Sequence, residues 1–360
     1  MSVRPPVLDA DGHVFERDEV LYQYLDSPFA GCVDMLYESF FPTNDGWHRT
    51  AHALALAQKR RGETYRHEGQ QAPDRPEITA QEWLKALDLT GIEATVLYPT
   101  RGLGFGRVRD PDWAVGLARA YNNWLYDQFT KQSSRLLGVA LVPVQNPECA
   151  VVELRRAVDE LGMVGGLLPG AGLKRAFGDE MYFPIYAAAQ DMGVPLIVHG
   201  GSAEGMGLDI FEHALEARAL AHQSGQVIQL TSMIFGGVFD RFPKLRVGYA
   251  EASVCWLPYV YDRLQRAYRN WFIEVPAVKT DPREVLRSGR LFFHTELDDA
   301  ALGAVVGMLG DEMMFYASDF PHEPVQEVEE TLDTFLARED LATVTKQRIL
   351  NDNARRLYSL

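Results

Sequence analysis

Five stretches of the chain place a histidine or a carboxylate at the carboxyl end of a short apolar run. They are residues 7–13, 195–199, 247–251, 291–294 and 314–319. Pro321 and Pro324 prevent the last run from continuing as a regular element, so we interpret it as a short buried strand that ends at Asp319. Strands that deliver metal-ligand residue types at their carboxyl ends are typical of a (β/α)8 barrel, whose site lies at that end.

Apolar segments alternate with helix-like intervals along most of the chain. The predicted strands cover residues 7–11, 95–98, 137–142, 165–168, 196–199, 247–251, 291–294 and 314–319, and helices are predicted at about 79–89, 111–132, 147–161, 182–192, 209–236, 253–272 and 298–308. Repeated alternation of this kind implies a parallel sheet, and near-continuous apolar strands are expected where both sheet faces are buried. We therefore predict an α/β fold, a (β/α)8 TIM barrel, formed by residues 1–360 as a single domain.

Two segments extend beyond this repeat. Residues 14–78 are too long for an ordinary connection after the first strand, and they are rich in aromatic residues. They contain a helix-like run near 48–61 and a polar, loop-like part near 62–76, and we expect the insertion to form a lid or a subunit contact. In the tail, one helix after Val325 is expected to complete the barrel, and a second, at about 341–358, to form a C-terminal appendage.

The bulk composition restricts the class of protein. A chain of 360 residues with 47% hydrophobic and 24% charged residues can bury a large core. Cys32, Cys149 and Cys255 lack the spacing of a zinc or redox motif, and the chain shows neither a signal peptide nor an apolar run that could span a bilayer, so we expect a cytoplasmic protein. The net charge of −15 disfavours nucleic acid and anionic membranes as partners. We expect a small-molecule substrate, metal ions and a homo-oligomer, with a dimer as the simplest case.

The candidate metal ligands lie at the predicted strand ends. Asp11 and His13 are two residues apart, so on an extended chain both side chains point to the same face and can bind one ion. Taken alone, Asp11 is more simply a turn cap, and His13 and His199 are more simply packed core histidines. Glu251 and Asp319 end two further strands, and a buried carboxylate without a cation or a donor would be strongly destabilising. The combination favours a metal site.

Other residues are weaker candidates. For His222 and His294, a role at the site, either in binding the metal or in supporting its ligands, is as consistent with the sequence as an ordinary structural role. His322 is more consistent with supporting Asp319 than with binding metal. Arg101 and Trp256 are candidate substrate contacts, although Arg101 is as easily a surface charge.

The sequence resembles the amidohydrolase superfamily, in the branch of aminocarboxymuconate-semialdehyde decarboxylase and related aromatic-acid decarboxylases. The segments that carry the resemblance are 8–13, 198–201, 236–247, 256–258, 262–264 and 317–322. It implies one divalent metal at the barrel mouth, held by an H-x-H pair, a fifth-strand histidine and an eighth-strand aspartate.

Two positions depart from that pattern. Asp11 stands where the first histidine of H-x-H is usual, and Glu251 stands where the sixth strand usually ends in a catalytic histidine. Carboxylate ligands shift the preference from zinc toward manganese or iron. Glu251 would replace the missing general acid or base if burial raised its pKa.

These observations lead to one leading function and two alternatives. We expect a metal-dependent hydrolase or non-oxidative decarboxylase of a small carboxylated or cyclic substrate, with Asp319 or Glu251 moving the proton. The surplus of ligand types also permits a non-haem di-iron monooxygenase, in which a glutamate bridges two ions. The third interpretation is an inactive barrel subunit that stabilises a partner chain.

Overall fold

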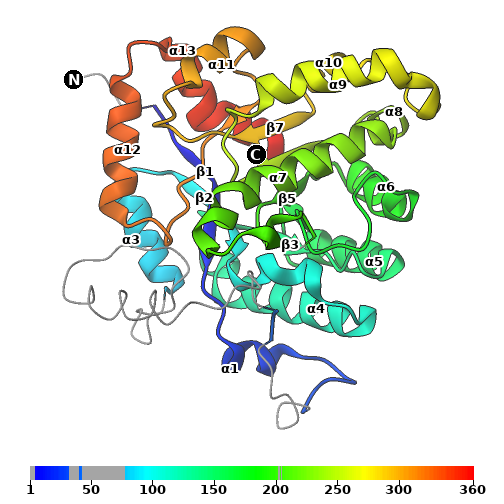
Figure 1. The fold of residues 1–360 in the computed structure, drawn as a ribbon. Helices are drawn as coiled ribbons and strands as arrows, with labels where there is room; N and C mark the ends of the chain where they lie inside the picture. Colours follow the sequence, from blue (N-terminus) through cyan, green and yellow to red (C-terminus); the bar gives the residue numbers. More distant parts are fainter. Residues whose placement is uncertain (1–4, 32–39, 43–77, 202, 204) are drawn as a thin grey trace.

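Eight parallel strands, hydrogen-bonded in sequential order, form the centre of the molecule (Figure 1). The computed structural model describes residues 5–31, 40–42, 78–201, 203 and 205–360. The strands are β1 (Leu8–Val14), β2 (Ala94–Pro99), β3 (Leu136–Leu141), β4 (Gly165–Pro169), β5 (Leu196–His199), β6 (Val247–Ala250), β7 (Leu291–His294) and β8 (Met314–Phe315). Ala10 N donates to Tyr316 O at 3.1 Å, and Asp319 N donates to Asp11 O at 3.1 Å, so the chain after β8 returns to β1. The predicted (β/α)8 TIM barrel is confirmed.

Helices cover the outside of the sheet and alternate with the strands (Figure 1). The α-helices are α1 (Asp18–Leu21), α3 (Ala80–Thr90), α4 (Pro111–Gln128), α5 (Pro147–Asp159), α6 (Phe183–Met192), α7 (Ala214–Phe235), α8 (Val238–Arg241), α9 (Leu257–Trp271), α10 (Pro282–Leu286), α11 (Leu302–Leu309), α12 (Val325–Ala337), α13 (Thr343–Gln347) and α14 (Asn353–Tyr358). Helix α3 begins at a capping box, in which Thr79 Oγ1 accepts from Glu82 N and Glu82 Oε2 accepts from Thr79 N. None of the helices in the described ranges has both the length and the apolar character that a membrane crossing requires.

Short helical turns connect several of these elements. The 3-10 turns are η1 (Tyr22–Tyr24), η3 (Arg101–Arg107), η4 (Thr130–Gln132), η5 (Glu180–Tyr182), η6 (Leu208–Ile210) and η7 (Phe272–Glu274), and η8 (Arg348–Asp352) is a π-helical turn between α13 and α14. The segment 341–358, for which a C-terminal helix is predicted, thus contains three helical pieces. Most of the predicted insertion, including its helix-like run near 48–61 and the polar part near 62–76, lies outside the described residues.

Strand β1 carries the first two ligand candidates and is buried along its whole length. Its pairing with β2 shifts register between Asp9 and Gly12, so strict alternation is broken there. Gly12 is required by close packing, because a Cβ at this position would lie 2.4 Å from both Thr95 Oγ1 and a ring carbon of Trp83. The irregularity lets Asp9 bond away from the site, although it is two residues from Asp11.

Two strands are shorter than predicted. Strand β6 ends at Ala250 and β8 ends at Phe315, so the prediction that strands reach Glu251 and Asp319 is wrong. Both carboxylates lie in turns with left-handed backbone, at φ 57° for Glu251 and φ 52° for Asp319. A strand cannot continue through such a residue, because extended backbone requires a negative φ.

Candidate metal centre

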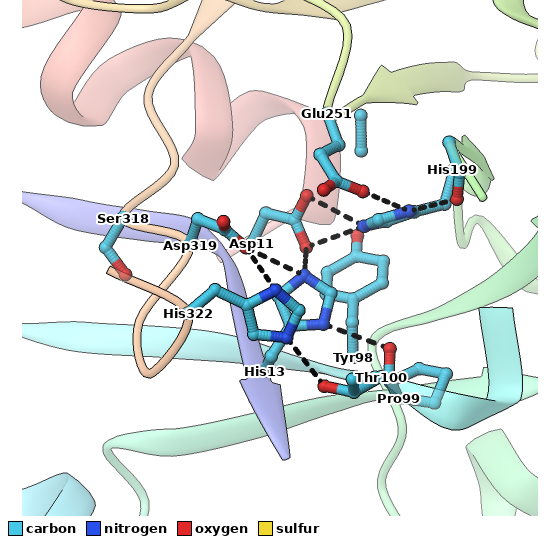
Figure 2. Close-up of polar contacts among 12 residues, drawn as sticks. Asp11, His13, Tyr98, Pro99, Thr100, His199, Glu251, Ser318, Asp319 and His322 are labelled. Carbon is cyan, nitrogen blue, oxygen red and sulfur yellow. Dashed lines mark hydrogen bonds and ion pairs between the residues drawn. The ribbon is translucent and has the colours of Figure 1, made fainter. Parts of the chain in front are cut away.

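Asp11, His13 and His199 converge at the carboxyl end of the barrel (Figure 2). One ligand atom from each residue lies within 4.8 Å of the others, and all three side chains are buried. Asp11 and His13 project from β1, and His199 ends β5 on the opposite wall. The structure therefore brings together the D-x-H pair and the fifth-strand histidine that the sequence singles out.

The imidazole of His13 presents a lone pair to this group. Its Nδ1 lies 3.0 Å from the backbone oxygen of Pro99 and donates to it, because a carbonyl can only accept. Burial, with the neighbouring His322 and His199, holds the pKa of His13 well below its usual range, so Nε2 carries no proton at neutral pH. This buried Nε2 has no hydrogen-bond partner, and it lies 3.5 Å from Asp11 Oδ1 and 3.3 Å from Asp319 Oδ1. A lone pair facing two carboxylates fits a bound cation.

His199 shows the opposite electrostatic behaviour. Its Nε2 lies 3.0 Å from Asp11 Oδ2, and its Nδ1 lies 2.8 Å from the backbone oxygen of Gly200. Burial lowers the pKa of His199, but the carboxylates of Asp11 and Glu251 outweigh burial and raise this pKa to about 9. A proton on Nε2 thus offsets the charge of Asp11, and a metal ion that bound there would replace that proton.

Asp319 and His322 come from the segment after β8. Asp319 Oδ1 lies 3.6 Å from His322 Nδ1, and the other ring nitrogen of His322 lies 2.8 Å from Thr100 Oγ1. The rings of His322 and His13 are stacked, with their centroids 4.5 Å apart (Figure 2). His322 therefore lies where it can hold Asp319 against His13.

Glu251 and Asp11 contact different ring nitrogens of His199, Nδ1 and Nε2 respectively (Figure 2). Its Oε2 lies 3.3 Å from His199 Nδ1, and its Oε1 lies 3.5 Å from His222 Nδ1. Burial raises the pKa of Glu251, but His222 and His199 outweigh burial, and the net shift is downward. The pKa of Glu251 is therefore not raised, as its expected role as a general acid or base would require, because the neighbouring imidazoles favour its ionised form. His294, another of these imidazoles, ends β7 and lines the same cavity.

A cavity of about 660 Å³ opens above the ligand group. Trp256, a predicted substrate contact, is among the residues that line it. Arg101 is not among the described lining residues. It forms a bidentate ion pair with Asp18, with Nη1 at 2.5 Å from Oδ1 and Nη2 at 3.1 Å from Oδ2. Arg218 supplies a guanidinium to the lining. Sequence reasoning missed Arg218, although its position four residues before His222 places both on one face of α7.

Two buried carboxylates shape the site without lining the cavity. Asp9 accepts hydrogen bonds from Thr95 Oγ1 at 2.6 Å and from both the backbone nitrogen and Oγ of Ser318 at 2.8 Å. Glu16 accepts from the backbone nitrogens of three consecutive residues after β2, Thr100, Arg101 and Gly102. Asp9 thus fixes the segment before Asp319, and Glu16 fixes the turn that carries Thr100.

The profile of the amidohydrolase family matches residues 43–360. The chain belongs to the amidohydrolase family. Among curated relatives, 2-amino-3-carboxymuconate-6-semialdehyde decarboxylase of Dictyostelium discoideum is 26% identical over 282 residues, which cover 78% of this chain and 75% of the relative. Gamma-resorcylate decarboxylase of Rhizobium sp. (strain MTP-10005) is 25% identical over 290 residues, which cover 77% of this chain and 86% of the relative. The predicted resemblance is confirmed.

Solved structures share the barrel. The 5-carboxyvanillate decarboxylase of Novosphingobium aromaticivorans, complexed with manganese and 4-hydroxy-3-methoxy-5-nitrobenzoic acid, superposes with a TM-score of 0.73 at 21% identity, over 99% of this chain and 96% of that chain. An amidohydrolase from Mycobacterium avium subsp. paratuberculosis superposes with a TM-score of 0.75 at 19% identity, over 99% of this chain and 100% of that chain.

The protein is an enzyme, as the sequence predicts, and the interpretation as an inactive barrel subunit is set aside.

Proposed function

We propose that this amidohydrolase is a metal-dependent, non-oxidative decarboxylase of a small aromatic acid. The observation that carries the proposal is the buried lone pair of His13 Nε2, which faces Asp11 and Asp319 beside His199. Such a set of two imidazoles and two carboxylates suits one divalent ion. The decarboxylases among the relatives support the reaction, and the acids in their names support the substrate class.

Asp11, His13, His199 and Asp319 would hold the ion. When bound, the ion supplies a Lewis acid that orients a substrate carboxylate and stabilises developing negative charge. Two carboxylate ligands favour manganese or iron over zinc, and the manganese in the 5-carboxyvanillate decarboxylase supports manganese as the first choice. Zinc as the bound ion would indicate a different ligand set from the one proposed.

Asp319 would act as the proton donor. In the reaction the bond between the ring carbon and the carboxylate breaks, CO2 leaves, and the electron pair on the ring carbon takes a proton from the Asp319 carboxyl group. Solvent in the cavity then returns a proton to Asp319, whose side chain is 19% exposed. His322, held by Thr100, keeps the carboxyl group aimed at the reacting carbon.

The exposed guanidinium of Arg218 and the indole of Trp256 would receive the rest of the substrate. A guanidinium pairs with an acidic or phenolic oxygen, and an indole face packs on an aromatic ring. Glu251 would hold the Nδ1 side of His199, so that its Nε2 faces the ion.

The test is anaerobic turnover of hydroxybenzoic acids by the manganese-loaded enzyme in D2O. The expected products are CO2 and an arene that carries one deuterium at the vacated carbon. Asp319→Asn should lower kcat by about 100-fold or more, the usual contribution of a positioned acid. Asp191→Asn, the same change at an exposed position of α6, should retain normal turnover.

Two results would overturn the assignment. Asp319→Ala with unchanged metal content and turnover would exclude Asp319 from the site. Turnover that needs oxygen and a reductant would instead favour the di-iron monooxygenase, because a non-oxidative decarboxylation consumes neither.

A further inference from the structure

Helix α7 packs one face against the strand ends that carry His199 and Glu251. His222 lies so close to Gly200 that a Cβ at Gly200 would be 2.8 Å from His222 Cγ. Glycine after His199 therefore permits the close approach of the helix. Gln226 follows His222 by four residues, so both side chains lie on the same face of α7.

The side-chain amide of Gln226 links β5 to β6. Its Nε2 donates to the backbone oxygen of Val198 at 3.0 Å and to that of Ala250 at 2.6 Å. These two residues directly precede His199 and Glu251. Gln226 is fully buried, and both protons of its amide nitrogen are used. One side chain thus fixes the last carbonyl group before each of two site residues.

The other polar atom of this amide argues against a role in packing alone. Gln226 Oε1 is buried and has no hydrogen-bond partner among the described residues. An unpaired buried acceptor destabilises a fold, and an apolar side chain of similar length would avoid that cost. The glutamine is therefore explained by its two donated hydrogen bonds and not by its volume.

The turn after β6 is held by two side chains of α7. Glu251 has left-handed backbone at φ 57°, although it is not a glycine. His222 Nδ1 lies 3.1 Å from the backbone oxygen of Glu251 and donates to it, because a carbonyl can only accept. Gln226 binds the preceding carbonyl, that of Ala250. A left-handed residue persists where its surroundings fix it in this way.

The same contacts hold the end of β5. Gly200 N donates to Ala250 O at 3.3 Å, so this oxygen accepts from both β5 and α7. His199 Nδ1 lies 3.3 Å from Glu251 Oε2, and this spacing depends on how close the two strand ends lie. Loss of the Gln226 bonds would let the ends of β5 and β6 separate, and the imidazole of His199 would lose the carboxylate beside it.

We propose that Gln226 is a positioning residue of the metal centre, which places His199 through Val198 and Glu251 through Ala250. Gln226 is not among the described residues that line the cavity, so it acts through the two strand ends. Groups that orient a metal-binding histidine contribute about 10- to 100-fold to metal affinity. The inference rests on the metal centre of the proposed function, and it holds whether or not the bound ion serves decarboxylation.

The test compares Gln226→Met with Gln229→Met in the full chain. Gln229 lies three residues further along α7 and is also buried, but its amide bonds Phe177 N and Gly170 O, which belong to neither β5 nor β6. Both variants should lower the denaturant midpoint of the metal-free protein by a similar amount. Titration should show that Gln226→Met binds Mn²⁺ about 10-fold more weakly than the wild type, whereas Gln229→Met retains the wild-type affinity.

Amide hydrogen exchange gives a second readout, which needs no metal. Exchange at Gly200 N–H should be about 10-fold faster in Gln226→Met and unchanged in Gln229→Met, because only the first variant loosens the contact of Gly200 with Ala250. Wild-type Mn²⁺ affinity in Gln226→Met, or an equal loss of affinity in the two variants, would overturn the proposed role.

Two further outcomes are distinguishable. If Gln226→Met does not fold, Gln226→Asn takes its place, because its side chain is one carbon too short to keep both bonds, and it should show the same loss of Mn²⁺ affinity. Wild-type protein that binds no Mn²⁺ would overturn the role together with the metal centre. Absence of CO2 release by protein that binds Mn²⁺ would count against decarboxylation and leave the role of Gln226 in place.

Discussion

The two buried histidines of the metal centre differ in charge because of the residues beside them. His13 donates to a carbonyl and lies near other imidazoles, whereas His199 faces Asp11 and Glu251. The same residue type is therefore held neutral at one position and protonated at the other. A metal ion would bind His13 directly, but it would have to displace a proton from His199.

This difference predicts a pH dependence for binding of the metal ion. The pKa of His199 is raised to about 9, so below that pH each ion bound should release close to one proton from His199 and none from His13. The affinity should rise by about tenfold per pH unit from about 7 to 9 and level off above that. Calorimetry in two buffers of different ionisation enthalpy measures the protons released. An affinity that stays constant between these pH values would contradict the assignment of His199 as a ligand.

Among single residues, the sequence reveals the candidates at strand ends, but it does not reveal residues whose hydrogen-bond partners are distant in the chain. Asp11, His13 and His199 follow from alternation and from the apolar runs that precede them. Asp9 has the same local pattern as Asp11, but a register shift turns it toward Ser318, more than 300 residues away. Local sequence does not encode that shift.

The turn after β2 depends on one buried carboxylate. Glu16 is 1% exposed and accepts the backbone N–H groups of residues 100–102, so it organises the start of η3 and the position of Thr100. Through Thr100 it also supports His322. This connection joins β1, β2 and the segment after β8 into one wall of the site.

Glu16→Gln should show how burial of this charge affects stability. Burial raises the pKa of Glu16 above its usual 4.5, and its N–H donors offset this only in part. A raised carboxyl pKa contributes stability below the unfolded pKa, and this contribution is lost as the pH rises through the folded pKa. Because the variant loses acceptor capacity, its free energy of unfolding should be about 1–3 kcal/mol lower than that of the wild type, and this difference should shrink as the pH rises from about 4.5.

Denaturant unfolding of both proteins at several pH values measures this margin. Glu19→Gln, at a largely exposed carboxylate on α1, is the matched control and should show little change at any pH. A margin that grew with pH would mean that the ionised form of Glu16 is the stabilising one.

The boundaries of elements were predicted less well than their existence. All eight strands occur where apolar runs predict them, because strands buried on both faces need such runs. The ends of β6 and β8 were misplaced, since the left-handed residues Glu251 and Asp319 carry no local signal such as glycine. At the site, this small error matters, because a turn aims a carboxylate differently from a strand.

At the scale of the whole molecule, the C-terminal helix α14 is connected to the barrel wall under the metal centre. Tyr358 OH donates to the backbone oxygen of Ala10 at 3.1 Å and is paired with Tyr98 OH. Burial holds the pKa of both hydroxyls well above the usual range, so both stay protonated. The repeat of strands and helices predicts the barrel, but periodicity could not reveal that its last residues contact its first strand.

The direction of the hydrogen bonds from Tyr98 through Tyr358 to Ala10 predicts that removal of either hydroxyl lowers the free energy of unfolding by a different amount. Since Tyr358 donates to Ala10, Tyr98 must donate to Tyr358, and the two hydroxyls are not equivalent. Tyr98→Phe removes one buried hydrogen bond and should cost about 1 kcal/mol of unfolding free energy. Tyr358→Phe leaves both the Ala10 carbonyl and the Tyr98 hydroxyl without this partner and should cost about 2–4 kcal/mol.

Thermal and denaturant unfolding of the two variants, each a loss of one hydroxyl from a fully buried ring, compares these costs directly. Because Ala10 lies beside Asp11, Tyr358→Phe should also weaken binding of the manganese ion, whereas Tyr98→Phe should leave it closer to the wild-type value. Equal destabilisation by both variants would mean that the contact with Ala10 contributes nothing, and that α14 is held by its apolar packing alone. The larger loss for Tyr358→Phe would instead show that the end of the chain helps to position the first ligand strand.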